Sequence, residues 1–462
     1  MKSKLVKATS LVLTTAMVLG TASMAFAGEY KVQKGDCLWK IAPKYSITWQ
    51  TLADMNKLSN PNLIFPDQIL NVPDISTVPQ KEAEPEKTEN MDTVVLEKTE
   101  EKSADTAVLS SLDIADISMT GTHLEPGFAP DITDYTVNVQ DDIYGVKLTP
   151  KAVDGIVITV DGNELSEDGS YIVELDQSIE GYGKDYSIDA VVKATDGESE
   201  TEYTIHIIRE NAADTYALFT PGEYVDKETG VTLPYELYVP TNYDSAKKYP
   251  VVYVMHGAGQ RNQPLDMVLK RYQSATIWAK DSEAGINECI VVSPQIVPAD
   301  GNGWTKFMLT YDKVAKEANP YEMQDWAVAG YNLLQEIKSQ YSVDENKIYA
   351  TGLSMGGFGT YATAIAHPDE FAAIVPVCGG GDPEAISALK DKTAVWLFHA
   401  KDDPAVPFEY TEKTIAALEA ADMDYKATIY DAGDIFYPNA HFSWTPAYAN
   451  KDMRTWLFEQ SK

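Results

Sequence analysis

The order of apolar and polar residues divides the chain into five segments, and the first has the pattern of a secretory signal peptide. Lysines at positions 2, 4 and 7 precede the apolar stretch LVLTTAMVLG, and the small residues AFA end the segment at Ala27. This order predicts export, with residues 1–27 removed. A retained membrane anchor is less favoured because the apolar stretch is short and rich in threonine. No later segment is long and apolar enough to span a bilayer.

The next two segments differ sharply in pattern. In residues 28–73, EYKVQKGD and QILNVP predict strands, and CLWKIAPKY and TWQTLADMNK predict short helices between them, so we expect a compact βααβ unit. Residues 74–108 are rich in Glu, Lys, Thr and Pro and almost lack aromatic residues. Such a composition cannot bury enough apolar surface to offset its ordering entropy. We therefore expect a disordered, charged linker there.

Residues 109–210 alternate apolar and polar positions. The alternation is seen in YTVNVQ, VKLTPKAV, IVITVDG, YSIDAVVKA and TEYTIHIIRE, which are separated by turns rich in Asp, Gly and Asn. This pattern predicts an all-β sandwich. No catalytic arrangement of residues appears in it, since His123 is expected in a loop and His206 on a strand face. We expect this domain to act as a spacer or an interaction module.

Residues 211–462 alternate short apolar runs with helical patterns. YPVVYVMHGAG, CIVVSPQIV, KIYATGL, AAIVPVCGGG, TAVWLFHA and YKATIYDAG predict strands, while DWAVAGYNLLQEIKSQY and PFEYTEKTIAALEAA predict helices. This order predicts a mainly parallel sheet with helices on both faces. In such folds the functional site lies at the carboxyl ends of the strands.

Composition narrows the ligands that the chain is expected to bind. Its 462 residues are too many for one core, which agrees with several domains. The formal net charge of −33 would repel phosphates, so nucleic acid is disfavoured and a carbohydrate or a small neutral ester is a more natural ligand. Three cysteines do not make a disulfide framework. Cys289 and Cys378 lie in apolar runs and are expected to be small buried residues.

The strongest chemical motif is GLSMG at residues 352–356, between the strand KIYA and the helix GFGTYATAIA. It matches G-x-S-x-G, the nucleophile elbow, in which a serine occupies a strained turn and the flanking glycines give the backbone room. Ser354 would present its hydroxyl at the N-terminus of a helix, whose dipole favours a developing oxyanion. Ser354 is therefore the candidate nucleophile.

A serine nucleophile needs a base, and the base needs an orienting carboxylate. In the fold with this elbow, the acid and then the histidine follow the serine along the chain. His441 lies downstream of the loop KDDPAVP, which supplies Asp402 and Asp403. We predict that His441 is the base, Asp403 the acid and Asp402 a turn residue, since Pro404 fixes the backbone after Asp403. No further ligands cluster near the two aspartates, so no metal is expected, and His399 on the preceding strand is expected to be structural.

The segment MHGAGQ follows the first strong strand of the C-terminal domain. His-Gly loops of this kind donate one backbone N–H group to an oxyanion, and the residue after the serine donates the other. We assign these donors to Ala258 and Met355, with Gly259 as the alternative to Ala258. The chemistry of such a site requires no cofactor.

Residues 211–462 resemble the α/β-hydrolase superfamily, and more closely its secreted esterase branch, which includes feruloyl and acetyl esterases and relatives of prolyl oligopeptidase. The resemblance rests on LPYELYVPTNYDSAKKYPVVYVMHGAGQRN, YATGLSMGGFGTYATAIAHPDEFAAIVPVCGGGD, VWLFHAKDDPAVPFEYTEKTIAALEAA and HFSWTPAYANKDMRTWLF. It implies carboxylic-ester hydrolysis. The family's acid stands two residues before Val-Pro, which fits Asp403. Trp304, Phe442 and Trp444 lie in loops near the expected site, where they either stack on a substrate or pack internally.

The first two folded segments also resemble known families. Residues 109–210 are similar to cadherin-like bacterial β-sandwiches. Residues 28–73 strongly resemble a LysM module through VQKGDCLWKIA and NKLSNPNLIFPDQILNVP. The LysM resemblance implies binding of N-acetylglucosamine-containing glycans such as peptidoglycan or chitin. The residues at the matching contact positions are Gly35, Asp36, Cys37, Leu38, Asn60, Asn62, Leu63 and Ile64. Cys37 replaces the usual Thr or Ser, and Asp67 the usual Gly.

Together these features favour a secreted, cell-wall-associated bacterial serine esterase, which acts through a Ser-His-Asp triad and an acyl-enzyme. Its expected substrates are ester-decorated polysaccharides or small esters. One alternative is a serine peptidase of the prolyl-oligopeptidase type, which is less favoured because the propeller domain that such peptidases often carry is missing. Another is a non-catalytic wall-binding protein, which the intact set of serine, histidine and aspartate argues against.

Overall fold

The structure is a computed structural model and describes residues 26–32, 41–45, 52, 55–57, 68–73, 107–178 and 183–462. The chain divides into two compact units, residues 1–100 and 101–462. Among the described residues, no helix has the length and apolar character needed to cross a membrane.

The first unit contains two antiparallel strands, β1 (Phe26–Lys31) and β2 (Ile69–Pro73), and the short 3₁₀ helix η1 (Ala42–Tyr45). They enclose a small core of Val32, Ile41, Leu52, Leu70 and Val72. The two strands agree with the outer strands of the predicted βααβ unit. β1 begins at Phe26, inside the segment expected to be removed with the signal peptide. The eight predicted glycan contacts, most of the linker and most of the signal segment lie outside the described residues.

The second unit begins with the predicted β-sandwich, which is confirmed. Apolar and polar residues alternate along its strands, so that each strand turns its apolar side chains toward the core. In β4, for example, Tyr135, Val137 and Val139 are buried while their neighbours are more exposed. One sheet has the order β4-β10-β9-β6-β7 and the other the order β3-β5-β8. The strands are β3 (Leu109–Ala115), β4 (Asp134–Val139), β5 (Gly145–Ala152), β6 (Val157–Val160), β7 (Asn163–Glu164), β8 (Tyr171–Glu174), β9 (Tyr186–Thr195) and β10 (Glu200–Arg209).

The C-terminal domain is built on an eight-stranded sheet with the order β11-β12-β14-β13-β15-β16-β17-β18. The strands from β14 to β18 in this order run parallel, and β12 and β11 add an antiparallel edge. This confirms the predicted mainly parallel sheet. The strands are β11 (Phe219–Val225), β12 (Thr232–Tyr238), β13 (Tyr249–Met255), β14 (Ile290–Pro294), β15 (Val343–Leu353), β16 (Ala373–Val377), β17 (Ala394–Ala400) and β18 (Lys426–Tyr430).

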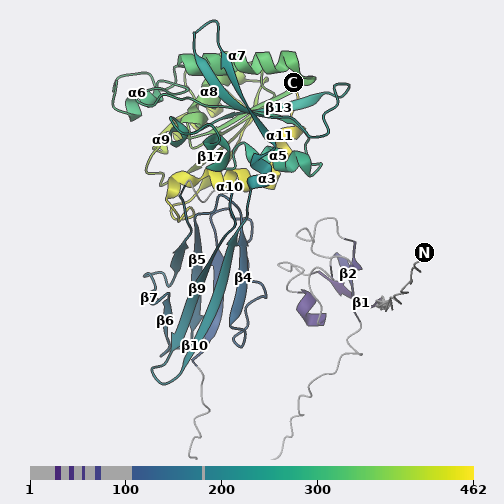
Figure 1. The fold of residues 1–462 in the computed structure, drawn as a ribbon, viewed down its shortest axis with the longest axis vertical. Coiled ribbons are helices and arrows are strands. Elements are labelled where there is room, and N and C mark those ends of the chain that lie inside the picture. The colour runs from purple at the N-terminus through teal and green to yellow at the C-terminus, as the bar shows by residue number, and fades with distance from the viewer. Residues whose placement is uncertain are drawn as a thin grey trace, which may run out of the picture. The chain divides into compact units, whose positions relative to one another are not determined.

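Helices cover both faces of this sheet (Figure 1). Along β13, Val251, Tyr253 and Met255 belong to one apolar cluster, and Val252 and Val254 to the other. The first cluster includes residues of α6 to α9, and the second includes residues of α5, α10 and α11. The helices are α3 (Ala213–Tyr216), α4 (Met267–Lys270), α5 (Thr276–Glu283), α6 (Phe307–Tyr311), α7 (Asp325–Gln340), α8 (Met355–Ala366), α9 (Glu409–Ala420), α10 (Trp444–Ala449) and α11 (Lys451–Glu459), with 3₁₀ helices η4 (Ala258–Gln260), η5 (Ile386–Leu389) and η6 (Ala440–Phe442).

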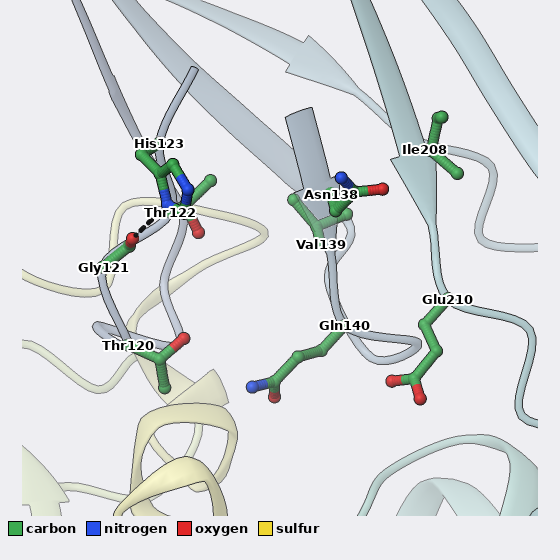
Figure 2. Close-up of a pocket in the computed structure, with 9 residues that line it drawn as sticks. All are labelled: Thr120, Gly121, Thr122, His123, Asn138, Val139, Gln140, Ile208 and Glu210. Atoms are coloured by element: carbon green, nitrogen blue, oxygen red, sulfur yellow. Dashed lines mark hydrogen bonds between the residues drawn. The ribbon is translucent and has the colours of Figure 1, made fainter. Parts of the chain in front are cut away.

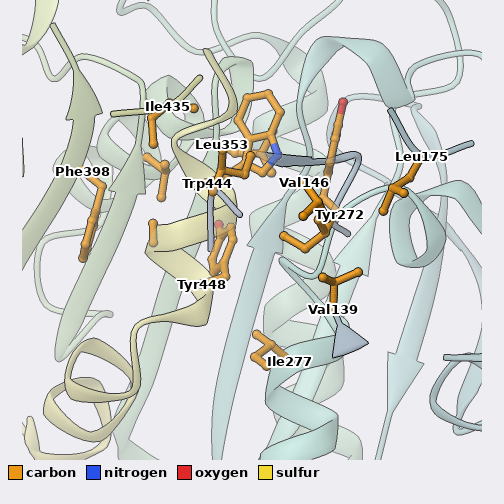
Figure 3. Packing of buried hydrophobic residues seen from close by; sticks show 14 of the residues in the cluster. Val139, Val146, Leu175, Tyr272, Ile277, Leu353, Phe398, Ile435, Trp444 and Tyr448 are labelled. Carbon is orange, nitrogen blue, oxygen red and sulfur yellow. The ribbon is translucent and has the colours of Figure 1, made fainter. Parts of the chain in front are cut away.

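The sandwich and the C-terminal domain share a continuous apolar core. Figure 3 shows Val139 and Val146 of the sandwich in the same cluster as Tyr272, Ile277 and Trp444 of the C-terminal domain. Because this shared core removes apolar surface of both domains from water, it stabilises their contact. The sandwich is therefore packed against the C-terminal domain, which a spacer role would not require.

Candidate active site

Ser354 lies in a strained turn between β15 and α8. Its backbone has φ 54° and ψ −117°, a conformation that costs a non-glycine residue energy. The flanking glycines allow this turn, because a Cβ atom on Gly356 would collide with the carbonyl oxygen of Met255, and one on Gly352 would lie 2.5 Å from that of Gly356. The GLSMG motif thus folds as the predicted elbow.

The structure brings Ser354, His441 and Asp403 together at the carboxyl ends of the strands. His441 Nε2 lies 3.0 Å from Ser354 Oγ, and His441 Nδ1 lies 2.7 Å from Asp403 Oδ2. A carboxylate only accepts hydrogen bonds, so Nδ1 carries the proton and donates it to Asp403. Nε2 is then free to accept the hydroxyl proton of Ser354. This geometry is suited to activating the serine as a nucleophile.

Asp403 is held as a charged carboxylate although it is buried. Its Oδ1 atom accepts hydrogen bonds from the backbone N–H groups of Ala405 (2.8 Å) and Val406 (2.9 Å). Burial alone would raise the pKa of Asp403, but hydrogen bonds from His399 and His441, the charge of His441 and the Val406 N–H group outweigh it. The pKa therefore lies well below the usual range of an aspartate. Asp403 is therefore ionised at neutral pH.

The neighbouring aspartate has a different environment. Asp402 is exposed, and its Oδ2 atom accepts a hydrogen bond from the backbone N–H group of Gly433 at 3.1 Å. The two carboxylates of the DD pair thus have different partners, and only Asp403 contacts His441. Asp402 lies in the turn after β17, and its contact joins this turn to the loop after β18.

The loop proposed to supply an oxyanion donor is fixed by a buried histidine. His256 donates its Nδ1–H to the carbonyl oxygen of Gly257 (2.7 Å), and its Nε2 accepts the backbone N–H of Ile296 (2.9 Å). Burial lowers the pKa of His256 to about 4, so the ring stays neutral. Within the described residues, the N–H groups of Ala258 and Met355 donate to no protein acceptor, which leaves both available to a ligand.

Cys378, directly after β16, contacts the elbow. Its Sγ atom accepts a hydrogen bond from the backbone N–H of Ser354 at 3.2 Å, and burial raises the pKa of its thiol well above the usual range. One ligating atom each of Cys378, Asp403 and His441 lies within 4.8 Å of the others. Each Asp403 oxygen already accepts two hydrogen bonds, however. We therefore assign these three residues to the hydrogen-bonded network of the serine and not to a metal site.

The aromatic residues left open by the sequence have packing roles. Trp304 is fully buried, and its Nε1–H donates to the carbonyl oxygen of His256 at 3.0 Å, so it supports the loop before Ala258. Trp444 is also buried and meets the ring of His441 edge-on, with 5.0 Å between the ring centroids. These contacts position the ring of His441 and the loop before Ala258.

The sandwich contacts the segment that carries His441, which the sequence did not predict. The contact includes the pairs Tyr144 with Phe442, Lys147 with Phe436, and Gln177 with Tyr437. Tyr144 is buried, its ring lies 5.8 Å from that of Phe442, and its hydroxyl donates to the carbonyl oxygen of Arg271. A residue of the sandwich thus packs directly beside the histidine.

A hollow of about 490 Å³ lies on the sandwich (Figure 2). It is lined by residues 120–123 and 138–140 together with Ile208 and Glu210. None of these residues contacts Ser354, His441 or Asp403, and we assign no function to the hollow.

Three family models match consecutive parts of the chain. They are "LysM domain" over residues 30–73, "Cadherin-like beta sandwich domain" over residues 109–210 and "Putative esterase" over residues 227–421. The C-terminal domain is an esterase-family domain. It follows a LysM domain and a cadherin-like sandwich, as the resemblances in the sequence implied.

Individual proteins agree with these families. The chain is 25% identical over 206 residues to "Probable feruloyl esterase C" of Aspergillus terreus, covering 45% of this chain and 66% of that protein. It is 27% identical over 99 residues to poly(3-hydroxyalkanoate) depolymerase C of Paucimonas lemoignei, covering 18% of this chain and 24% of that protein. The chain thus spans less than two thirds of each relative. The crystal structure of a thermostable esterase matches with a TM-score of 0.52 and 26% identity, over 71% of this chain and 99% of that one.

Proposed function

We propose that this protein is an exported serine esterase that hydrolyses carboxylic esters through an acyl-enzyme on Ser354. The observation that carries the proposal is the hydrogen-bonded chain from Ser354 Oγ to His441 and on to Asp403, with the serine in a nucleophile elbow. The match to the esterase family over residues 227–421, which contains Ser354 and Asp403, supports the same reaction class.

In the proposed mechanism, His441 Nε2 takes the hydroxyl proton of Ser354 as its Oγ attacks the ester carbonyl. The backbone N–H groups of Ala258 and Met355 stabilise the oxyanion, and His441 then protonates the leaving alcohol. Asp403 stabilises the imidazolium that forms between these steps. Water repeats the sequence on the acyl-enzyme and releases the acid.

The proposed substrates are esters of phenolic or short-chain acids on polysaccharides. The names of the relatives support this class, since they include feruloyl esterases and an acetylxylan esterase from Neocallimastix patriciarum. The strongly acidic chain also fits neutral esters better than polyanionic substrates. A LysM domain at the N-terminus would hold the enzyme on a glycan, where it raises the local concentration of attached esters.

A substrate comparison tests the proposal. Hydrolysis of p-nitrophenyl acetate, methyl ferulate and a chromogenic proline peptide is measured with the wild type and with Ser354→Ala. We expect turnover of the esters that exceeds peptide turnover and depends on Ser354. Faster peptide turnover would point to a peptidase, and the absence of ester turnover by the wild type would refute the proposal.

The contact between the sandwich and the histidine segment gives a further prediction. Tyr144→Ala is expected to lower kcat for ester hydrolysis by roughly 10- to 100-fold, because an error of about 1 Å in the position of a catalytic group has this effect. Tyr144→Phe keeps the ring beside Phe442 and should retain most activity. Kinetics are normalised to serines titrated with a fluorophosphonate. An unchanged kcat in Tyr144→Ala would show that the sandwich does not position His441.

Glycan binding by the LysM domain is tested separately from catalysis. Deletion of residues 28–73 is expected to abolish sedimentation of the protein with insoluble peptidoglycan or chitin, while ester turnover of a small soluble substrate stays unchanged. Ser354→Ala serves as the matched control, since it should sediment like the wild type. Equal sedimentation of the deletion variant and the wild type would contradict glycan binding through this domain.

A further inference from the structure

A second histidine, His399, contacts the carboxylate of Asp403, although its sequence context predicts only a structural role. His399 lies on β17 and is fully buried, and its Nε2 atom is 3.0 Å from Asp403 Oδ2. The same oxygen lies 2.7 Å from Nδ1 of His441. Because a carboxylate only accepts hydrogen bonds, both histidines donate to this one oxygen. His399 therefore shares with His441 the atom that orients the proposed base.

The ring of His399 is itself fixed in one orientation. Its Nδ1 atom lies 2.6 Å from the hydroxyl oxygen of Thr411 in α9, and its ring meets that of Phe408 edge-on at 5.5 Å between centroids. Nε2 carries a proton, because its two neighbours, Asp403 Oδ2 and the carbonyl oxygen of Val406 (3.2 Å), only accept hydrogen bonds. The Thr411 hydroxyl in turn donates to the carbonyl oxygen of Gly379 at 3.2 Å. These contacts hold the ring with Nε2 facing Asp403.

We propose that His399 is a positioning residue that acts through Asp403 and weakens the interaction of this carboxylate with the imidazolium form of His441. The inference rests on the proposed function of Ser354, His441 and Asp403. The hydrogen bond from His399 helps to fix the position of the shared oxygen, and it takes up part of the negative charge on it. Without it, the carboxylate loses one of its fixed donors and interacts more strongly with the imidazolium form of His441.

Two consequences follow for the variant without this donor. The carboxylate gains rotational freedom, so the fraction of His441 aligned with Ser354 falls and kcat falls with it. The imidazolium form of His441 is favoured over the neutral base, so the acidic limb of the pH profile of kcat/KM moves to higher pH. A merely structural role of His399 would lower the folded fraction and leave the shape of this profile unchanged.

The titratable groups around the Asp403 carboxylate decide what a shift in the acidic limb of the pH profile reports. Among the described residues, the titratable side chains that face Asp403 are His399 on β17, His441 on η6 and Cys378 after β16. Burial raises the pKa of the Cys378 thiol well above its usual range, so it stays neutral over the assayed pH. Thr411 and the backbone N–H groups near Asp403 do not titrate. A change in the acidic limb after substitution of His399 therefore reports on the contact of Asp403 with His441.

The test compares His399→Leu with His399→Gln in the full chain. Leucine fills the volume without a donor, whereas the side-chain amide of glutamine offers an N–H near the position of Nε2. We expect His399→Leu to lower kcat per titrated serine roughly tenfold, the effect of one hydrogen bond to a charged group, with KM nearly unchanged and the acidic limb moved to higher pH. His399→Gln should recover most of kcat and the wild-type profile. A wild-type pH profile in His399→Leu, or equal losses in both variants, would overturn the proposal.

A second variant and a spectroscopic readout separate this inference from the proposed function. Thr411→Val keeps His399 but removes the hydroxyl that contacts its Nδ1 atom, and should show a smaller loss of kcat with the same direction of pH shift. In proton NMR of the wild type, we expect slowly exchanging ring N–H signals from both His399 and His441. The His441 signal should move downfield in His399→Leu whether or not a given ester is hydrolysed. An unmoved signal would overturn the role of His399, whereas absent ester turnover alone would contradict only the proposed function.

Discussion

Asp403→Asn lowers kcat for ester hydrolysis by about 10⁴-fold, whereas Asp402→Asn leaves it within a few-fold of the wild type. In the wild type, His441 Nδ1–H donates to a carboxylate oxygen of Asp403 at 2.7 Å. An asparagine at position 403 can instead place an N–H group against this Nδ1 atom. The histidine would then carry its proton on Nε2 and face Ser354 as a donor, which is the wrong tautomer for a base. Asp402 does not contact His441, and its removal costs only an exposed hydrogen bond from Gly433.

The comparison is made on purified variants with kcat normalised to the folded fraction from circular dichroism. Asp402→Asn is the matched control, because it makes the same chemical change one residue earlier. A larger loss of kcat in Asp402→Asn than in Asp403→Asn would show that Asp402, and not Asp403, is the acid. Equal, small losses would show that no carboxylate in this loop orients His441.

Ser354→Ala lowers kcat for esters by about 10⁶-fold, to the level of the residual effects of binding and the oxyanion donors. The substitution removes the only atom of the side chain that accepts the acyl group, and it leaves the strained backbone of the elbow with a Cβ of the same size. The variant should therefore unfold at nearly the temperature of the wild type. Turnover is measured with p-nitrophenyl acetate at high enzyme concentration. Activity above one hundredth of the wild type would exclude Ser354 as the nucleophile.

The elbow and its serine could be predicted because their determinants are local. A strand, a turn with glycines on both sides of x-S-x and a following helix are all visible within a short stretch, and the strained φ of Ser354 is the direct result of that pattern. His441 and Asp403 could be predicted because the fold fixes their order along the chain. For the same reason the mainly parallel sheet followed from the order of apolar runs and helical segments.

The residues that support the site could not be predicted, because their roles depend on contacts between distant elements. His399 and Cys378 appeared as isolated residues in apolar runs, and His256 only as the first residue of a His-Gly loop. Nothing in the local pattern pairs His399 with Asp403, Cys378 with the N–H of Ser354, or His256 with the backbone of Ile296. The spacing of four residues between His399 and Asp403 was the one available signal for the second histidine. It places the strand residue and the loop residue on one side of the strand end.

The docking of the sandwich shows the same limit. Alternation along its strands predicts the sheets, but the contact of Tyr144 with Phe442 depends on the surfaces of two separately patterned domains. The loop between β4 and β5 carries polar residues that the pattern assigns to solvent. In the structure Asp141 and Asp142 are instead buried and accept hydrogen bonds from Gln273. Burial raises the pKa of both aspartates.

The central claim is that Ser354, activated by His441 and Asp403, carries the acyl group of an ester. Intact mass spectrometry after rapid mixing with p-nitrophenyl acetate and acid quenching tests it most directly. The account predicts one acetyl adduct on the wild type, located on the peptide that contains Ser354. It predicts no adduct on Ser354→Ala. An adduct on another residue, or ester turnover by Ser354→Ala above one hundredth of the wild-type rate, would contradict it.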